Sequence, residues 1–291
     1  MVVTNQQISF FREKGYLIIR DFLSPEEVEN LQSWAQQVHD WKPTTESEFM
    51  PYEVCFEPRY LVISVRKYSS RHQEVNASGK RVLCRTENFV DYHTGLNSLL
   101  RGEKLLGLLN ELAGEPMHLF KEKINYKLAG SGGFAPHIDA VAYTQIKDVK
   151  HLTILLSVDP SNMTNGGLEV VDGSHEMTIP INGKTHCIEA DWVDSQEWVP
   201  VELEAGQLLI FPSYLAHRSG PNNSSDDRKA IYATYNLASE GDMHREYYED
   251  RKKEWPATHM RKEGESYAKG ALTYGFGSPM LSVDAGKQVA F

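Results

Sequence analysis

The chain has 291 residues, of which 41% are hydrophobic and 24% are charged, and its formal net charge at pH 7 is −10. This composition is typical of a folded globular protein and excludes an intrinsically disordered chain. A broad surface for nucleic-acid phosphates would have to form against the overall negative charge, so we expect no nucleic-acid partner and favour a small-molecule substrate.

The cysteines and the apolar segments bear on the cellular compartment. Cys55, Cys84 and Cys187 are widely spaced and form no CxxC pair, a pattern that indicates reduced thiols. No stretch reaches the ~18 apolar residues of a membrane span, and the N-terminus lacks the apolar segment of a signal peptide. We therefore expect a cytoplasmic protein with no membrane partner.

The first part of the chain is predicted to be mainly helical. A capped helix is expected over residues 4–14 and a short strand over residues 16–19. Ser24, followed by proline and two acidic residues, is a suitable start for a second helix, which we expect to run to about Trp41.

The next segments differ from each other in periodicity. Residues 42–93 have no clean period and are predicted to form long loops with short strands, a setting that often carries substrate selectivity. Residues 98–113 have a broad apolar face of leucines, which predicts a helix that Gly114 ends.

From residue 117 onward the pattern changes to strands separated by turn residues. The predicted strands cover residues 117–128, 151–158, 168–171, 207–212 and 229–237. Helices followed by a run of antiparallel strands predict an α+β fold with a mainly β, double-sheet core. We expect a single domain over 1–291, with a helical part to about residue 115, the core at about 116–240, and a C-terminal helix and tail at 241–291.

Two residues that could bind a metal ion follow a glycine-rich turn. His137 and Asp139 follow this turn, and residues two apart on an extended backbone point the same way, so both can address one ion. His217 follows 80 residues later, after an apolar strand and a turn. Two histidines and one carboxylate that leave open positions are characteristic of non-haem Fe(II) oxygenases. The same three ligands also suit a catalytic zinc ion.

Two further residues suit the far end of a dicarboxylate cosubstrate. Arg228 lies 11 residues after His217 at the start of a predicted strand, and Ser219 lies two residues after His217. A guanidinium can grip a carboxylate through two parallel hydrogen bonds, and a nearby hydroxyl can add another donor. A dicarboxylate that chelates iron at one end needs hydrogen-bond donors of this kind at its other end.

The motifs also occur in a specific order. They are Phe10-Phe11-Arg12-Glu13-Lys14-Gly15-Tyr16, Leu23-Ser24-Pro25-Glu26-Glu27, Pro136-His137-Ile138-Asp139, Asn165-Gly166-Gly167-Leu168-Glu169-Val170, Gly173-Ser174-His175, Gly206, and His217-Arg218-Ser219 with Arg228. In this order the sequence resembles, over most of its length, the phytanoyl-CoA dioxygenase family of Fe(II)/2-oxoglutarate-dependent oxygenases.

The resemblance implies a double-stranded β-helix, a cupin-like jelly roll, with N-terminal flanking helices. It implies that His137, Asp139 and His217 bind Fe(II), and that Arg228 and Ser219 bind the C5 carboxylate of 2-oxoglutarate. It also implies that the enzyme uses O₂ to hydroxylate or otherwise oxidise a small molecule, with release of succinate and CO₂. Some relatives have glutamine at the position of Ile138, and this departure argues against a fatty acyl-CoA substrate.

One predicted strand carries an unusual polar face. Alternation places Lys121, Lys123, Asn125 and Lys127 on the same side of it. In the enzymes that the sequence resembles, the corresponding strand borders the cosubstrate, so Asn125 and Lys127 are candidates for contact with 2-oxoglutarate or substrate. A solvated polar face is the alternative interpretation.

Candidate substrate contacts are Arg85, Glu87, Asn88 and Tyr143. The first three would suit a small zwitterion or anion such as an aminophosphonate, whose hydroxylases occur in the resembling family, and aromatic residues would suit a natural-product intermediate. A surface strand is the alternative for residues 81–89. Two other functions stay open at this point: a zinc-type metallohydrolase on the same triad, and a non-catalytic jelly-roll binding protein.

Overall fold

The computed structural model describes residues 3–56, 80–142, 150–183, 185–270, 274, 283–284 and 287–288. Its main helices are α1 (Asn5–Lys14), α2 (Pro25–Asp40), α3 (Thr94–Leu100), α4 (Glu103–Ala113), α5 (Ala190–Asp194), α6 (His244–Glu254) and α7 (Ala268–Gly270). Its strands are β1 (Leu17–Ile19), β2 (Met50–Phe56), β3 (Lys80–Glu87), β4 (Met117–Lys127), β5 (Phe134–His137), β6 (His151–Ser157), β7 (Leu168–Val170), β8 (Val199–Val201), β9 (Leu208–Pro212), β10 (His217–Ser219), β11 (Arg228–Leu237), β12 (Val283–Asp284) and β13 (Lys287–Gln288).

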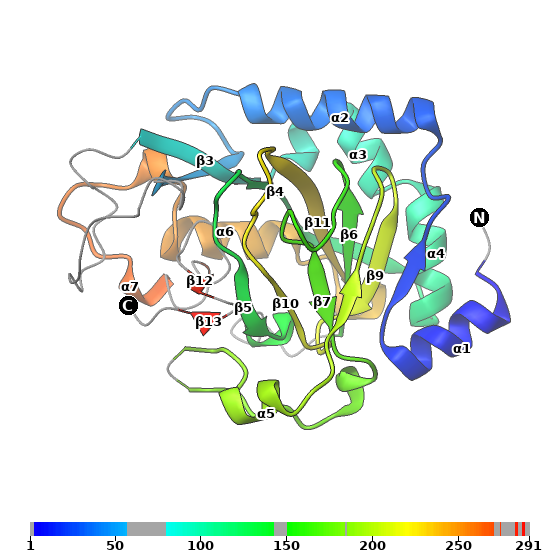
Figure 1. Ribbon diagram of the computed structural model, residues 1–291. Helices are drawn as coiled ribbons and strands as arrows, with labels where there is room; N and C mark the ends of the chain where they lie inside the picture. The colour runs from blue at the N-terminus through cyan, green and yellow to red at the C-terminus, as the bar shows by residue number, and fades with distance from the viewer. Residues whose placement is uncertain are drawn as a thin grey trace.

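Two antiparallel sheets face each other and form the jelly-roll core. The larger sheet has the strand order β1-β9-β6-β11-β4-β3-β2, and the smaller has the order β5-β10-β7-β8. Helices α1 to α4 gather around the larger sheet (Figure 1) and share one apolar core with its central strands. The expected α+β architecture with a jelly-roll core and flanking helices is therefore confirmed.

The central strands of the larger sheet are apolar on both faces because both faces are covered. On β6, Ile154 and Leu156 pack toward the helices, whereas Leu155 packs into the space between the two sheets. On β9, Ile210 packs toward the helices and Leu209 packs into the space between the two sheets. Strands buried on both sides are near-continuous apolar runs, and this explains why these segments have so few polar residues.

The first helices begin and end where their capping residues predict. Thr4 and Ser24 each accept a hydrogen bond from the backbone N–H three residues ahead, and Gln7 and Glu27 complete two capping boxes. Gly15 ends α1 with a φ of 81°, a left-handed conformation that suits glycine. The predicted boundaries of α1 and α2 hold to within one residue.

The single helix predicted over residues 98–113 is wrong, because the structure has two helices there, α3 and α4. Gly102 separates them as the N-cap of α4, and a Cβ atom at Gly102 would lie 2.2 Å from the carbonyl oxygen of Ser98. Apolar periodicity does not reveal this break, since leucines on both sides of it pack into the same core. The sequence also did not predict the short strands β5, β8 and β10.

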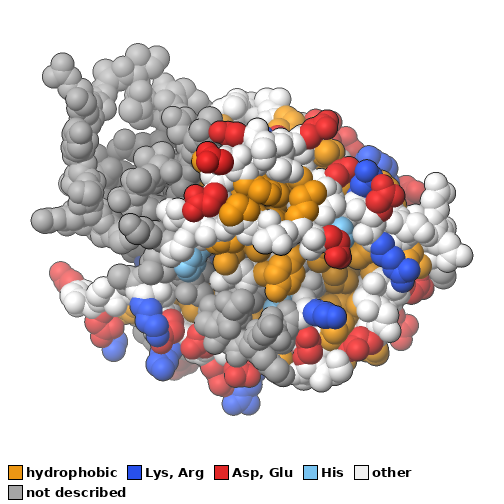
Figure 2. All heavy atoms as spheres, turned by 90° about the horizontal axis from the view of Figure 1, so that it is seen from below, with side chains coloured by type: hydrophobic (Ala, Val, Ile, Leu, Met, Phe, Trp, Pro, Cys, Tyr) orange, Lys and Arg blue, Asp and Glu red, His pale blue; other side chains and the backbone are white. Residues whose placement is uncertain are grey.

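One face of the molecule combines apolar and charged side chains. Figure 2 views the side on which α5 lies in Figure 1, and it shows hydrophobic side chains near the middle of this face with acidic and basic side chains interspersed around them. The core cluster of α5 and its neighbours includes Ile138, Val193 and the half-buried Trp192. In the described part of the chain, no helix has the length and apolar character needed to cross a membrane.

Two glycines near the α3–α4 break give a matched test of the packing. Gly102→Ala should lower the free energy of unfolding by about 1–3 kcal/mol, because the added methyl group overpacks against a backbone carbonyl. Gly107→Ala, inside α4, meets no heavy atom within 4 Å and should stabilise the protein by about 0.4–1 kcal/mol. Urea titrations of both variants measure this difference, and equal midpoints would contradict it.

Candidate active site

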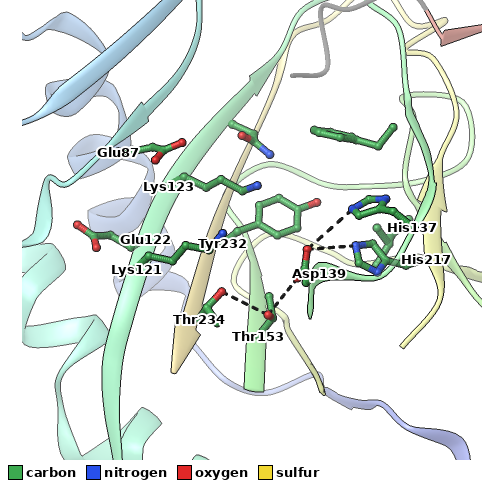
Figure 3. Close-up of a pocket in the computed structure, with 13 residues that line it drawn as sticks. Glu87, Lys121, Glu122, Lys123, His137, Asp139, Thr153, His217, Tyr232 and Thr234 are labelled. Atoms are coloured by element: carbon green, nitrogen blue, oxygen red, sulfur yellow. Dashed lines mark hydrogen bonds and ion pairs between the residues drawn. The ribbon is translucent and has the colours of Figure 1, made fainter. Parts of the chain in front are cut away.

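Three predicted metal ligands meet between the sheets at one end of the jelly roll. His137 ends β5, Asp139 begins the short 3-10 helix η3 (Asp139–Ala142), and His217 begins β10. Strands β5 and β10 pair with His137 directly opposite His217. One ligand atom from each of the three residues lies within 4.8 Å of the other two, and Figure 3 shows both imidazoles directed at Asp139.

The backbone orients both imidazole rings. Nδ1 of His137 lies 2.6 Å from the carbonyl oxygen of Ala135, and Nδ1 of His217 lies 2.9 Å from that of Leu215. A carbonyl can only accept, so each Nδ1 carries the proton and each Nε2 presents a lone pair. Both Nε2 atoms lie 3.8 Å from Oδ1 of Asp139. The three donor atoms therefore fit a metal ion bound on one face.

Electrostatics favour the protonation states that bind metal. Burial, together with the neighbouring His217, lowers the pKa of His137 to about 3. Burial alone would raise the pKa of Asp139, but the two histidines and nearby lysines hold it at about 2. A neutral imidazole and a carboxylate are the states that coordinate a metal, and two histidines with one carboxylate suit Fe(II).

A pocket opens in front of the triad and is lined by both sheets. Its other lining residues are Glu87, Lys121, Glu122, Lys123, Asn125, Phe134, Thr153, Leu168, Tyr232 and Thr234. Figure 3 shows Lys121 and Lys123 extending from β4 toward Tyr232 and the triad. The polar face predicted for this strand therefore faces the space between the sheets, and the alternative of a solvated face is wrong.

A second cluster of polar residues lies beyond this pocket. Lys127 and Arg228 are opposite each other in the pairing of β4 with β11, and both are buried. Nζ of Lys127 lies 2.9 Å from Oγ of Ser219, and Nη2 of Arg228 donates to the carbonyl oxygen of Gly166 over 2.9 Å. The structure thus brings Lys127, Ser219 and Arg228 together, whereas Asn125 lies in the pocket itself. Their roles stay predictions.

The four predicted substrate contacts have different environments. Glu87 lines the pocket, and its carboxylate binds Arg85 at 2.9 Å and Arg251 at 2.7 Å. Arg85 is buried beside it, also donating to the carbonyl oxygen of Tyr274. Asn88 instead donates its side-chain amide to the carbonyl oxygen of Glu48. Tyr143 lies outside the described residues, and the substrate roles of all four stay predictions.

The sequence analysis did not predict several residues that line or support the site. Thr153 was visible as a polar residue within the apolar run of β6, and it donates to Oδ2 of Asp139 over 3.1 Å. Tyr232 and Thr234 follow Arg228 on the same face of β11 by alternation, a signal that could have identified them. Arg251 had no local signal, since its partner Glu87 is 164 residues away in the chain.

Thr153 gives a test of how the metal is held. Thr153→Val removes the hydrogen bond that orients Asp139, and loss of such an outer contact typically weakens metal affinity about 10–100-fold. Ser157→Ala on the same strand is the control, because Ser157 donates to the carbonyl oxygen of Asp159 and lies away from the triad. Competition with a chelator measures both affinities. Equal iron retention in the two variants would contradict the proposed orienting role.

Comparison with known proteins agrees with this geometry. The family model of phytanoyl-CoA dioxygenase (PhyH) matches residues 11–230. The chain is 33% identical over 277 residues to 2-aminoethylphosphonate dioxygenase of uncultured bacterium HF130_AEPn_1, covering 95% of this chain and 98% of that protein. It is 34% identical over 251 residues to methylphosphonate hydroxylase of Gimesia maris, covering 86% of this chain and 87% of that protein.

Solved structures show the same fold. EctD from S. alaskensis with 2-oxoglutarate and 5-hydroxyectoine has a TM-score of 0.64 at 17% identity, covering 81% of this chain and 78% of that one. The epimerase SnoN in complex with Fe³⁺, alpha ketoglutarate and nogalamycin RO has a TM-score of 0.60 at 19% identity, covering 80% and 83% of the two chains.

These findings decide between the functions that the sequence left open. The family model spans well over half of the chain, and the more similar relatives match along nearly their whole length. The zinc-hydrolase and non-catalytic alternatives are set aside, and the expected iron and 2-oxoglutarate cofactors are confirmed. The chain belongs to the phytanoyl-CoA dioxygenase family and is an Fe(II)/2-oxoglutarate-dependent dioxygenase.

Proposed function

We propose that this dioxygenase hydroxylates a small phosphonate, and that Lys121 and Lys123 bind the phosphonate group. The observation that carries this proposal is the position of these two lysines on β4, where they line the pocket across from the triad. The 2-aminoethylphosphonate and methylphosphonate relatives support it through the substrates in their names. A third relative, from Stutzerimonas stutzeri, is a probable hypophosphite dioxygenase, 26% identical over 238 residues.

The acidic residues that line the pocket have other partners. Asp139 belongs to the metal triad. Glu87 binds two arginines, and Glu122 accepts hydrogen bonds from the backbone N–H groups of Phe89 and Val90 and contacts His244. Asp139 and Glu87 attract both lysines electrostatically, but hydrogen bonds tie the pocket acids to other groups, and a bound Fe(II) would add positive charge. A pocket of this kind favours an anionic substrate.

The state of the two lysines supports the same conclusion. Burial, with the charge of Lys123 added, lowers the pKa of Lys121 well below its usual value. Burial, with the charge of Arg85 added, lowers the pKa of Lys123. An anion placed between them would relieve this repulsion and favour their charged forms. The phosphonate oxygens provide several acceptors for two ammonium groups and for the amide of Asn125.

The proposed binding mode divides the site into two ends. Lys121, Lys123 and Asn125 hold the substrate on the β4 side, and Arg228 with Ser219 holds the far carboxylate of 2-oxoglutarate at the other end. When bound, Fe(II) and 2-oxoglutarate activate O₂ for oxidation of the substrate, with release of succinate and CO₂. The protein's own residues fix which C–H group faces the metal and exclude water from the pocket.

We also propose that the protein acts in the cytoplasm. The wide spacing of Cys55, Cys84 and Cys187, with no CxxC pair among them, supports a reducing compartment.

A substrate panel tests the proposal. Iron-loaded enzyme should release succinate above its background rate with methylphosphonate or 2-aminoethylphosphonate, and phosphorus NMR should show a hydroxylated product. The carboxylate analogues of these compounds and a fatty acyl-CoA should give only the background rate, because they lack the phosphonate dianion. Turnover with the acyl-CoA but with neither phosphonate would contradict the proposal.

Lys123→Met tests the subsite itself. Losing one charged hydrogen bond of about 1.5–3 kcal/mol should raise the KM for the phosphonate roughly ten- to a hundredfold. Iron retention should not change, because Lys123 is not a metal ligand. Lys150→Met is the control, since Lys150 is exposed and does not line the pocket. Steady-state kinetics that give the two variants the same KM would exclude Lys123 from substrate binding.

A further inference from the structure

Glu87 is the pocket acid best placed to receive the ammonium group of a zwitterionic substrate. It lines the pocket on the side opposite the triad (Figure 3). A phosphonate held by Lys121 and Lys123 would bring an amino group on its carbon chain into the same space. Whether Glu87 can accept that group therefore decides between a zwitterionic and a purely anionic substrate.

Two arginines already bind this carboxylate. Nη2 of Arg251 donates to Oε1 of Glu87 over 2.7 Å, and Nε of Arg251 lies 2.5 Å from Oε2. Nε of Arg85 lies 2.9 Å from Oε1. An ionised carboxylate has roughly four acceptor positions, and cations of the protein take three of them here. Arg251 alone faces both oxygens, in the side-on manner of a strong guanidinium–carboxylate pair.

Several contacts hold Arg251 in this position. It comes from α6, and only 1% of its surface is exposed. Its guanidinium lies over the rings of Tyr52 and Tyr274, at 4.9 and 4.8 Å from the ring centroids. It also donates to the carbonyl oxygen of Tyr274 over 3.5 Å. Arg251 could therefore release Glu87 to a substrate only by giving up these stacking contacts as well.

The second acid and the aromatic rings of the described pocket also have partners. Oε1 of Glu122 accepts from two backbone N–H groups, and its Oε2 lies 2.9 Å from Nε2 of His244. A lysine Nζ of β4 lies 5.8 Å from the ring centroid of Phe134, and another lies 5.3 Å from that of Tyr232. A substrate ammonium would have to compete with a cation of the protein at each ring.

The electrostatic balance at this end of the pocket opposes a further cation. Burial alone would raise the pKa of Glu87, but Arg251, Arg85 and the two lysines of β4 that line the pocket lower it. Four cationic side chains thus act on one carboxylate. A substrate ammonium would add a fifth positive charge in an enclosed space, whereas an uncharged alkyl group meets no such repulsion.

We propose that the substrate is an alkylphosphonate without an amino group, and that Arg251 sets this specificity by holding the carboxylate of Glu87. The inference rests on the phosphonate substrate proposed above and narrows it to one class. Arg251 is not among the residues that line the pocket, so it is a positioning residue that acts through Glu87.

Two phosphonates of the same length measure this specificity. In propylphosphonate a methyl group takes the place of the ammonium group of 2-aminoethylphosphonate. Phosphorus NMR of the products gives kcat/KM of the iron-loaded enzyme for each, at a pH at which both phosphonates are dianions and the amine is protonated. The wild-type enzyme should prefer propylphosphonate at least roughly tenfold, because a buried ammonium without an acceptor loses the hydrogen bonds that it made to water.

Arg251→Met should reduce this preference roughly ten- to a hundredfold, because it frees one side of the Glu87 carboxylate for the ammonium group. Arg251→Gln should act in the same direction and gives a second reading if the first variant folds poorly. Arg245→Met is the control and should keep the wild-type preference, since Arg245 is exposed on the same helix and pairs with Glu249. A purely structural role of Arg251 would lower kcat/KM for both phosphonates equally and leave their ratio unchanged.

A wild-type enzyme that prefers 2-aminoethylphosphonate would overturn the inference, and so would an unchanged ratio in both Arg251 variants. Either result includes turnover of a phosphonate, so the proposed function would stand. Absence of turnover with these two phosphonates and with methylphosphonate would instead contradict the proposed function, and this inference with it.

Discussion

The pairing of β5 with β10 is the constraint on which the site depends. It places His137 opposite His217, although the two residues are 80 positions apart in the chain. The carbonyls of Ala135 and Leu215, each two residues before a histidine, then fix the rings with Nε2 directed inward. A shift of one residue in this pairing would turn one imidazole to the opposite face and separate the ligands. The jelly roll therefore supplies the metal geometry through its register.

The rest of the fold makes that register stable. Helices α1 to α4 cover the outer face of the larger sheet, so its central strands are held from both sides. This support allows the inner faces of β4 and β11 to carry polar and charged groups in an enclosed space. Burial gives these cations their affinity for anions, since charges in a dry site interact more strongly than in water. The same burial makes the anion sites proposed for substrate and cosubstrate consistent with a chain of net negative charge.

Local patterns in the sequence predicted much of this arrangement. Capping residues gave α1 and α2, alternation placed Lys121 and Lys123 on one face of their strand, and the order of the motifs gave the triad. The break at Gly102 was missed because both helices use the same apolar core. The contact of Arg251 with Glu87 was missed because it joins distant segments, and short strands such as β5 and β10 are too brief to have a period of their own. Each of these depends on tertiary pairing, which one sequence does not display.

In the proposed arrangement, the substrate binds on the β4 side of the pocket and the distal carboxylate of 2-oxoglutarate binds at Arg228 and Ser219, with the triad between them. A crystal structure of the anaerobic complex with Fe(II), 2-oxoglutarate and a phosphonate tests it most directly. We expect iron on His137, Asp139 and His217, the distal carboxylate at Arg228 and Ser219, and the phosphonate against Lys121 and Lys123. A distal carboxylate bound to Lys123, with Arg228 bound only to the carbonyl oxygens of Asn165 and Gly166, would contradict this arrangement.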